Sequence, residues 1–103
     1  MYRVEYLPSY ADDLDAILYH LAIAQKSRRA AEDLLDALDE AVQELTEFPH
    51  RHRRYLSAWP LETEYRIMGV KGNAVFYTID EQAQAVKIHR ILNGHRDFDQ
   101  WLA

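Results

Sequence analysis

The 103-residue sequence contains no cysteine, only three glycines and three prolines, and no long apolar run. Without cysteine, disulfide bonds and thiolate chemistry are excluded. No stretch approaches the ~20 apolar residues that a membrane-spanning helix needs, and residues 1–5 lack the apolar core of a signal peptide. Repeats, linkers and low-complexity segments are also missing from the sequence. We therefore expect residues 1–103 to form a single cytoplasmic domain that makes no membrane contact.

Negative charge is concentrated in the first half of the chain. Residues 1–47 carry 4 Lys/Arg against 11 Asp/Glu, whereas residues 48–103 carry 8 against 6, which gives −7 and +2 and the net charge of −5. An acidic protein has little general affinity for nucleic acid, because such affinity comes from neutralising phosphates. The more basic half can still meet an anionic partner. Acidic helix surfaces are common, however, and explain the asymmetry equally well.

The beginning of the chain predicts one strand and one helix. Tyr2, Val4 and Tyr6 alternate with polar residues, which is the period of a half-buried strand. We expect this strand to end at Pro8-Ser9, with Ser9 capping the helix that follows. The apolar stripe of that helix consists of Leu14, Ile17, Leu18 and Leu21. We expect the carboxylates of Asp12, Asp13 and Asp15 to lie on a solvated face of this helix.

A second helix is predicted from its N-cap Ser27 to about Phe48, where Pro49 ends it. Only a short break near residues 25–27 separates the two helices, so we expect an antiparallel helical hairpin. The apolar seam of the second helix is expected to contain Leu35, Leu38, Val42 and Leu45, widened by Leu34 and Ala41.

Three strands are predicted in the second half, at residues 64–70, 74–80 and 85–92. The Gly72-Asn73 pair suits the positive φ angles of a tight hairpin turn between the first two. Residues 98–102 are expected to add a final helical turn. Strict alternation along the last strand separates two sets of side chains, Val86, Ile88 and Arg90 on one face and Lys87, His89 and Ile91 on the other.

The element order β-α-α-β-β-β predicts an α+β fold. An N-terminal strand and an antiparallel two-helix hairpin precede a three-stranded antiparallel sheet, and the hairpin covers one face of the sheet. The opposite face, which the helices leave uncovered, is the expected working surface.

The connector at residues 50–60 begins with the densest basic run of the chain, His50-Arg51-His52-Arg53-Arg54. This run can contact nucleic acid or an acidic partner, or it can be a solvated loop that Tyr55 and Trp59-Pro60 fasten to the core. Its two histidines do not predict a metal site, because no third ligand has a recognisable spacing and the arginines repel a cation.

The ordered set of these patterns resembles the RelE/ParE superfamily of bacterial type II toxin–antitoxin toxins. YRVEYLPSYADDLDAILYHLA is similar to the opening strand and first helix of the family, and LLDALDEAVQELTEFPH to its second helix. EYRIMGVKGNAVFYTIDE and VKIHRILNGHRDF are similar to its sheet. The resemblance implies a growth-inhibiting toxin that a cognate antitoxin neutralises and that needs no cofactor. It implies one of two targets, because ParE-like members poison DNA gyrase and RelE-like members cleave messenger RNA on the ribosome.

Carried over position by position, the resemblance gives a thinned set of catalytic candidates. Arg66 matches the basic residue of the family's first central strand, whereas Ala74 falls where nuclease members carry a central arginine. Asn93 and His95 replace a Tyr and an Arg that relatives often carry. The complete set of candidates is Arg66, His89, Arg90, His95 and Arg96.

RNA cleavage needs groups that transfer protons and cations that stabilise the phosphate in the transition state. His89 or His95 can supply the first, and the three arginines the second. Structural roles are the competing interpretation, since His89 can be an ordinary strand residue. Arg90 can pair with Asp80 or Asp97, and Arg96 with Asp97. The thinned set and the acidic charge favour gyrase over RNA, and a non-toxic binding module of the same fold remains the third hypothesis.

Overall fold

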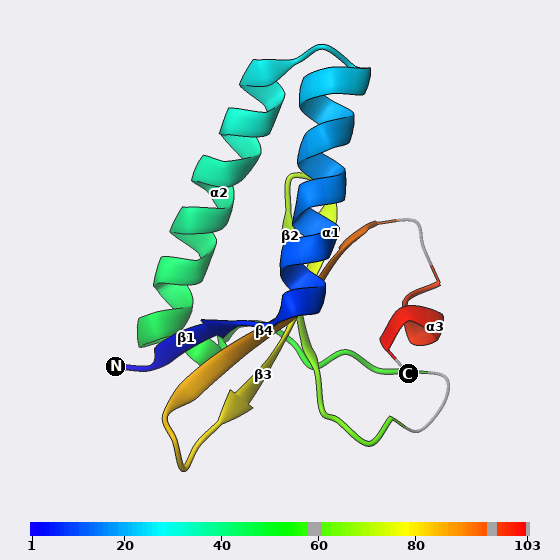
Figure 1. Cartoon of the computed structure of the whole chain (residues 1–103). Coiled ribbons are helices and arrows are strands. Elements are labelled where there is room, and N and C mark those ends of the chain that lie inside the picture. The colour runs from blue at the N-terminus through cyan, green and yellow to red at the C-terminus, as the bar shows by residue number, and fades with distance from the viewer. Residues whose placement is uncertain (58–60, 95–96, 103) are drawn as a thin grey trace.

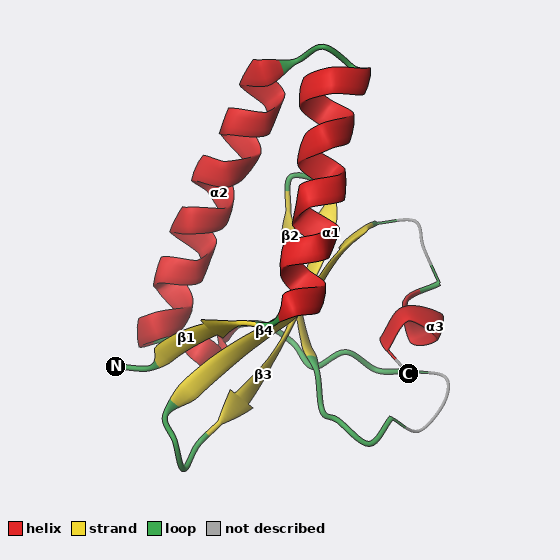
Figure 2. Ribbon diagram, in the orientation of Figure 1, coloured by secondary structure: helices red, strands yellow, loops and turns green. Residues whose placement is uncertain are grey.

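The structure is a computed structural model that describes residues 1–57, 61–94 and 97–102. Figure 2 shows the long helices above the sheet and a short C-terminal helix beside it. In chain order the elements are β1 (Arg3–Tyr6), α1 (Pro8–Tyr19), a π-helical turn (His20–Ala24), α2 (Arg28–Glu47), a 3-10 turn (Pro49–Arg51), β2 (Arg66–Val70), β3 (Asn73–Asp80), β4 (Ala85–Asn93) and α3 (Phe98–Leu102). The predicted α+β fold is confirmed.

The four strands form one sheet in the order β1-β4-β3-β2. β2, β3 and β4 are antiparallel neighbours, as predicted, whereas β1 joins the edge of β4 in parallel, so that the sheet is mixed. The helical hairpin of α1 and α2 covers one face of this sheet (Figure 1).

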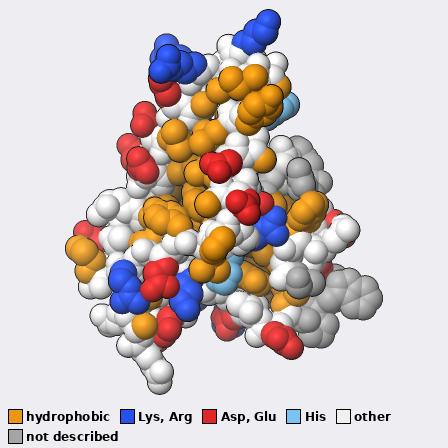
Figure 3. All heavy atoms as spheres, viewed as in Figure 1, with side chains coloured by type: hydrophobic (Ala, Val, Ile, Leu, Met, Phe, Trp, Pro, Cys, Tyr) orange, Lys and Arg blue, Asp and Glu red, His pale blue; other side chains and the backbone are white. Residues whose placement is uncertain are grey.

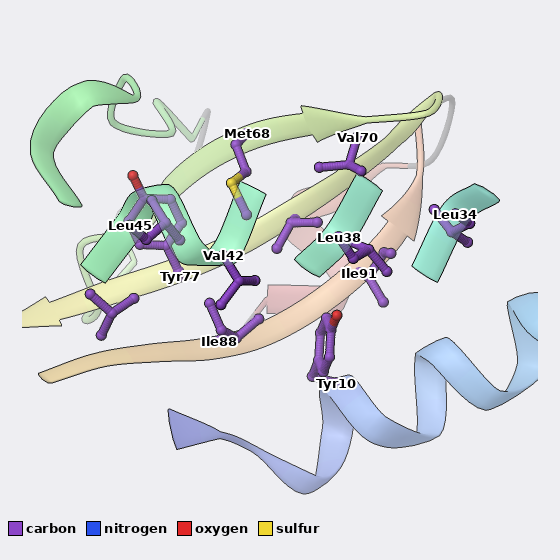
Figure 4. Packing of buried hydrophobic residues seen from close by; sticks show 12 residues of the cluster. Tyr10, Leu34, Leu38, Val42, Leu45, Met68, Val70, Tyr77, Ile88 and Ile91 are labelled. Atoms are coloured by element: carbon purple, nitrogen blue, oxygen red, sulfur yellow. The ribbon is translucent and has the colours of Figure 1, made fainter. Parts of the chain in front are cut away.

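The main core lies between α2 and the sheet (Figure 4). Leu38 and Leu45 of α2 are buried in this core, and so is Tyr77, whose hydroxyl donates to the carbonyl of Pro49 at 2.7 Å. The apolar seam of α2 begins one residue earlier than predicted. Leu34 is 2% exposed and belongs to the core, whereas Leu35 is 39% exposed, because the helical period carries it round to the side of the hairpin.

A bulge in β4 corrects the alternation predicted for that strand. Phe76 pairs with Arg90 but the next residue, Tyr77, pairs with Ile88, so that His89 is an extra residue. Such an insertion reverses the facing of every later side chain. Ile91 therefore joins the core under the helices, and Arg90 does not share a face with Ile88.

The turn between β2 and β3 is displaced by one residue from the prediction. Val70 pairs with Asn73, and the two residues with positive φ are Lys71 (50°) and Gly72 (79°) rather than Gly72-Asn73. Two successive positive φ angles match the twist of the flanking strands. The amide of Asn73 donates to the Val70 carbonyl at 3.4 Å, which ties the side chain back onto the turn.

Of the two predicted helix caps, one is confirmed. The hydroxyl of Ser27 accepts from the amide of Ala30 at 3.2 Å at the start of α2. Ser9 is not a cap, because Leu7 holds the N-cap position and Pro8 is the first residue of α1, a position that suits the fixed φ of proline. The Ser9 hydroxyl instead donates to the carbonyl of His89 at 2.7 Å.

The outer face of the sheet is partly covered, which corrects the expectation of an open face. Tyr55 and Phe98 both pack edge-on against Phe76, and Leu102 of α3 is buried in the same cluster. The Tyr55 hydroxyl also donates to Asp99. Tyr55 thus fastens the connector to the core as predicted, while the prediction for Trp59-Pro60 lies outside the described residues.

Two glycines provide a matched test of this architecture. A Cβ added at Gly94 would lie 2.9 Å from the Gly72 carbonyl oxygen, whereas a Cβ at Gly69 would meet nothing within 4 Å. We expect Gly94→Ala to lower the free energy of unfolding by about 1 to 3 kcal/mol, because backbone must move. Gly69→Ala should be neutral or stabilise by up to about 1 kcal/mol. Urea unfolding measures both, and equal effects would contradict the close approach at Gly94.

Candidate functional site

The most enclosed ionic interaction among the described residues joins α1 to β4. Arg90 donates from Nε to Asp13 Oδ2 at 2.6 Å and from Nη2 to Oδ1 at 2.7 Å. The amide of Ile91 donates to the same carboxylate at 3.2 Å. The two side chains are only 20% and 14% exposed. Asp13 is therefore not part of a solvated face, and Arg90 pairs with neither of the carboxylates expected for it.

Arg90 also holds the C-terminal helix. Its Nη1 donates to the carbonyl of Trp101 at 3.0 Å, and its guanidinium carbon lies 5.5 Å from the centre of the Trp101 ring, within the range of a cation–π contact. Hydrogen bonding to Asp13 raises the pKa of Arg90 above its ordinary value. The donors of this guanidinium are thus directed at the protein itself.

His89 is half-buried on the outer side of the bulge. Its Nε2 is hydrogen-bonded to the Thr78 hydroxyl at 2.9 Å, and its ring meets Tyr65 edge-on at 5.1 Å. Burial, assisted by the positive charge of Lys87, lowers the pKa of His89. A neutral imidazole is a competent general base, but no described cation other than Lys87 and Arg90 accompanies it on this strand.

Arg66, at the start of β2, pairs with Tyr77 of the neighbouring strand β3. Its Nη1 donates to the carbonyls of His50 and His52, at 3.2 and 2.7 Å. These bonds fix the 3-10 turn that follows α2 and the loop after it. Arg66 therefore has a structural role at the end of the sheet, whatever further contact it makes.

A polar cluster that the sequence patterns did not indicate lies close to Arg66. Glu81 accepts from the hydroxyl of Tyr2 at 2.8 Å and is hydrogen-bonded to the ring of His50. The Tyr2 hydrogen bond, with a smaller effect from His50, lowers the pKa of Glu81. The three residues come from the segment before β1, the turn after α2 and the β3–β4 turn, so that no local motif could have revealed the cluster.

The basic run after α2 is largely paired with acids. Arg51 contacts Glu44 at 2.6 Å and Arg54 contacts Glu64 at 3.1 Å. Burial lowers the pKa of His52. Within the described ranges no group of three or more His, Cys, Asp or Glu side chains is placed to hold a metal ion.

The candidate residues that the structure describes do not converge on one point. Arg66 shares a face with the buried Tyr77, whereas His89 and Arg90 occupy the bulge and the edge beyond it. Ala74, at the position of the missing arginine, is buried in the outer cluster. His95 and Arg96 lie outside the described residues.

Comparison with known proteins decides the family. Residues 4–98 match the sequence model described as the ParE toxin of the type II toxin–antitoxin system parDE. The chain belongs to the ParE toxin family. Solved structures agree with the fold of this ParE-family chain, and one of them, titled the chromosomal ParDE TA system from P. aeruginosa, has a TM-score of 0.61 and 21% identity. That match covers 90% of this chain and 96% of the other.

The comparison with curated proteins gives no match to this ParE-family member. Among its described helices, none combines the length and the hydropathy that crossing a membrane requires.

Because Asp13 pairs with Arg90, replacing Asp13 by the nearly isosteric asparagine should strongly lower the stability of the fold. Asp13→Asn leaves the partly buried Arg90 without a counter-charge, so we expect the free energy of unfolding to fall by about 2 to 4 kcal/mol. Asp12→Asn changes the same charge on the exposed neighbour and should cost less than about 0.5 kcal/mol. Chemical denaturation measures the difference, and equal costs would show that the pair does not stabilise the fold.

The lowered pKa values of His52 and His89 predict that the stability of the fold depends on pH. An unfolded histidine titrates near about 6.5, and both His52 and His89 titrate lower in the folded chain. Below about pH 6.5 the unfolded state therefore binds more protons, and stability should fall as pH decreases. Urea unfolding between about pH 8 and 5.5 should show this slope. The slope should shrink in His89→Gln and shrink further in His52→Gln/His89→Gln; an unchanged slope would assign it to other groups.

Proposed function

We propose that this chain is the toxin of a type II toxin–antitoxin module, that it inhibits growth by acting on DNA gyrase, and that a cognate antitoxin neutralises it. The observation that carries the proposal is the match to the ParE toxin family over residues 4–98. The similar ParDE structure comes from a toxin–antitoxin system, which supports an antitoxin as the partner.

The arrangement of the candidate residues supports gyrase rather than messenger RNA as the target. A ribonuclease site brings an acid, a base and phosphate-binding cations to one scissile bond. Here Arg66 donates to two backbone carbonyls, and Arg90 to Asp13 and the Trp101 carbonyl. The two arginines serve different parts of the fold, and the central position is the buried Ala74.

Controlled induction of the chain in a bacterial host separates the hypotheses. We expect growth arrest with altered supercoiling of a reporter plasmid and accumulation of cleaved gyrase–DNA complexes, while transcripts stay intact. Rapid cleavage of messages with normal supercoiling would instead establish the ribosome-dependent endoribonuclease. Normal growth at verified expression, with no small antitoxin gene beside its own, would leave the non-toxic binding module.

Arg66→Ala should weaken toxicity under either mechanism, since it removes the cation of the first central strand and two hydrogen bonds to the loop. Arg66→Lys keeps the charge but lacks the forked geometry, so it separates the two contributions. Growth after induction is scored together with circular dichroism of the purified variants. Full toxicity of a folded Arg66→Ala protein would remove Arg66 from the site.

A further inference from the structure

The far end of the helical hairpin gathers positive charge within the acidic half of the chain. Residues 1–47 contain only four Lys or Arg residues, and three of them lie within four positions where the π-helical turn leads into α2. These three residues, Lys26, Arg28 and Arg29, form what we call the basic tip. Figure 3 shows Lys and Arg side chains at this end of the hairpin and acidic side chains along the helices below it. The two signs of charge are thus separated along the hairpin.

The side chains of the basic tip extend into solvent. Those of Arg28 and Arg29 are each 90% exposed, and Lys26 is exposed as well. Each arginine approaches an acid one turn along α2 through its Nε, Glu32 at 3.4 Å and Asp33 at 3.9 Å. Ion pairs of this length and exposure contribute little to stability. Stabilisation of the fold therefore does not explain why the cations gather here.

The basic tip also opposes the local conformational preferences of the chain. Lys26 has a φ of 54°, a left-handed conformation in which glycine, the usual residue after a helix, is less strained. Arg28 and Arg29 occupy the first turn of α2, which contains no acidic residue, although the helix dipole favours anions at that place. Residues that break local rules without a stabilising gain are commonly retained for function.

Apolar side chains accompany the cations at the same end of the hairpin. Tyr19, the last residue of α1, and Ile23 of the π-helical turn are 65% and 58% exposed. The amide of Ser27 donates to the carbonyl of Leu21 at 2.9 Å, which closes the turn between them. Surfaces that bind DNA combine cations on phosphates with apolar side chains that contact a groove. The end of the hairpin has both kinds of group.

We propose that the basic tip docks on double-stranded DNA, with its three cations on phosphates and with Tyr19 and Ile23 against the adjoining groove. The forked donors of arginine match the geometry of a phosphate, and the duplex supplies a continuous row of them. The acidic flanks of the hairpin repel the same duplex, so that contact is confined to the tip. Under the proposed function, on which the source of the DNA rests, this is the duplex that gyrase holds.

The salt dependence of binding to a short, fluorescently labelled duplex tests the contact on the purified full chain. Each phosphate that the protein neutralises contributes about −0.9 to the slope of log affinity against log salt, so we expect a slope of about −2 to −3. Arg28→Gln/Arg29→Gln should bind at least about tenfold more weakly at low salt and lose about two units of slope. No measurable binding by the unaltered chain at low salt would overturn the proposal.

A second double variant controls for net charge. Arg53→Gln/Arg54→Gln makes the same charge change in the exposed connector and should keep the slope of the unaltered chain. Equal losses of affinity in the two double variants would mean that only net charge matters, and would overturn the proposal.

Urea unfolding provides a readout that a structural role would move in the opposite direction. The midpoint of Arg28→Gln/Arg29→Gln should be unchanged or higher, because the arginines oppose the helix dipole. The midpoint of Lys26→Gly should rise while its affinity for the duplex falls, because glycine adopts the positive φ without strain. A lower midpoint in both variants would assign the tip to the stability of the fold and overturn the proposal.

A polyglutamate peptide and growth after induction complete the test. Tighter binding of the tip to polyglutamate than to the duplex would assign it to an acidic protein surface and overturn the proposal. A non-toxic chain that binds the duplex through the tip would defeat the proposed function and leave this inference standing. A chain that poisons gyrase but binds the duplex equally well without Arg28 and Arg29 would overturn the inference alone.

Discussion

The sheet depends on how α1 completes the edge of β4. β1 is only four residues long, and its parallel pairing ends at Ile88. Beyond that point two side chains of α1, one helical turn apart, act in place of a strand. Ser9 donates to the His89 carbonyl, and Asp13 accepts from the Ile91 amide. Polar edge groups that would otherwise attract another chain are thereby bonded within the fold.

The bulge and the ion pair work together. By inserting His89, the bulge directs Arg90 to the edge, where it meets Asp13, and returns Ile91 to the core. Without the extra residue, a strictly alternating strand would place an arginine under the helices. Because Arg90 also contacts Trp101, this edge links α1, β4 and α3. Arg90, a catalytic candidate in the sequence, thus makes contacts that connect three elements of the fold.

Local patterns in the sequence predict the helices and strands well, because each rests on a hydrophobic period or on a turn residue close by. Ser27 caps α2 as predicted, and β2, β3 and β4 begin and end within two residues of their predicted bounds. Features that depend on distant partners were wrong. Asp13 and Arg90 are 77 residues apart, and so Asp13 was placed on a solvated face. The alternation of β4 failed for the same reason, since a bulge is defined only against the neighbouring strand. For the candidate site, the sequence indicates which residue types are available, but it does not predict which of them lie close together in the fold.

The position of β1 has a consequence for how the chain acquires its structure over time. Residues 3–6 pair with residues 85–88, so the first strand to be synthesised docks on the last. The helical hairpin can form early from local contacts, but the sheet beneath it stays incomplete until nearly the whole chain is available. Pairings between distant segments are slow to form. A growing or truncated chain would therefore expose the apolar undersides of its helices, and complete synthesis is a condition for any surface that the sheet and hairpin build together.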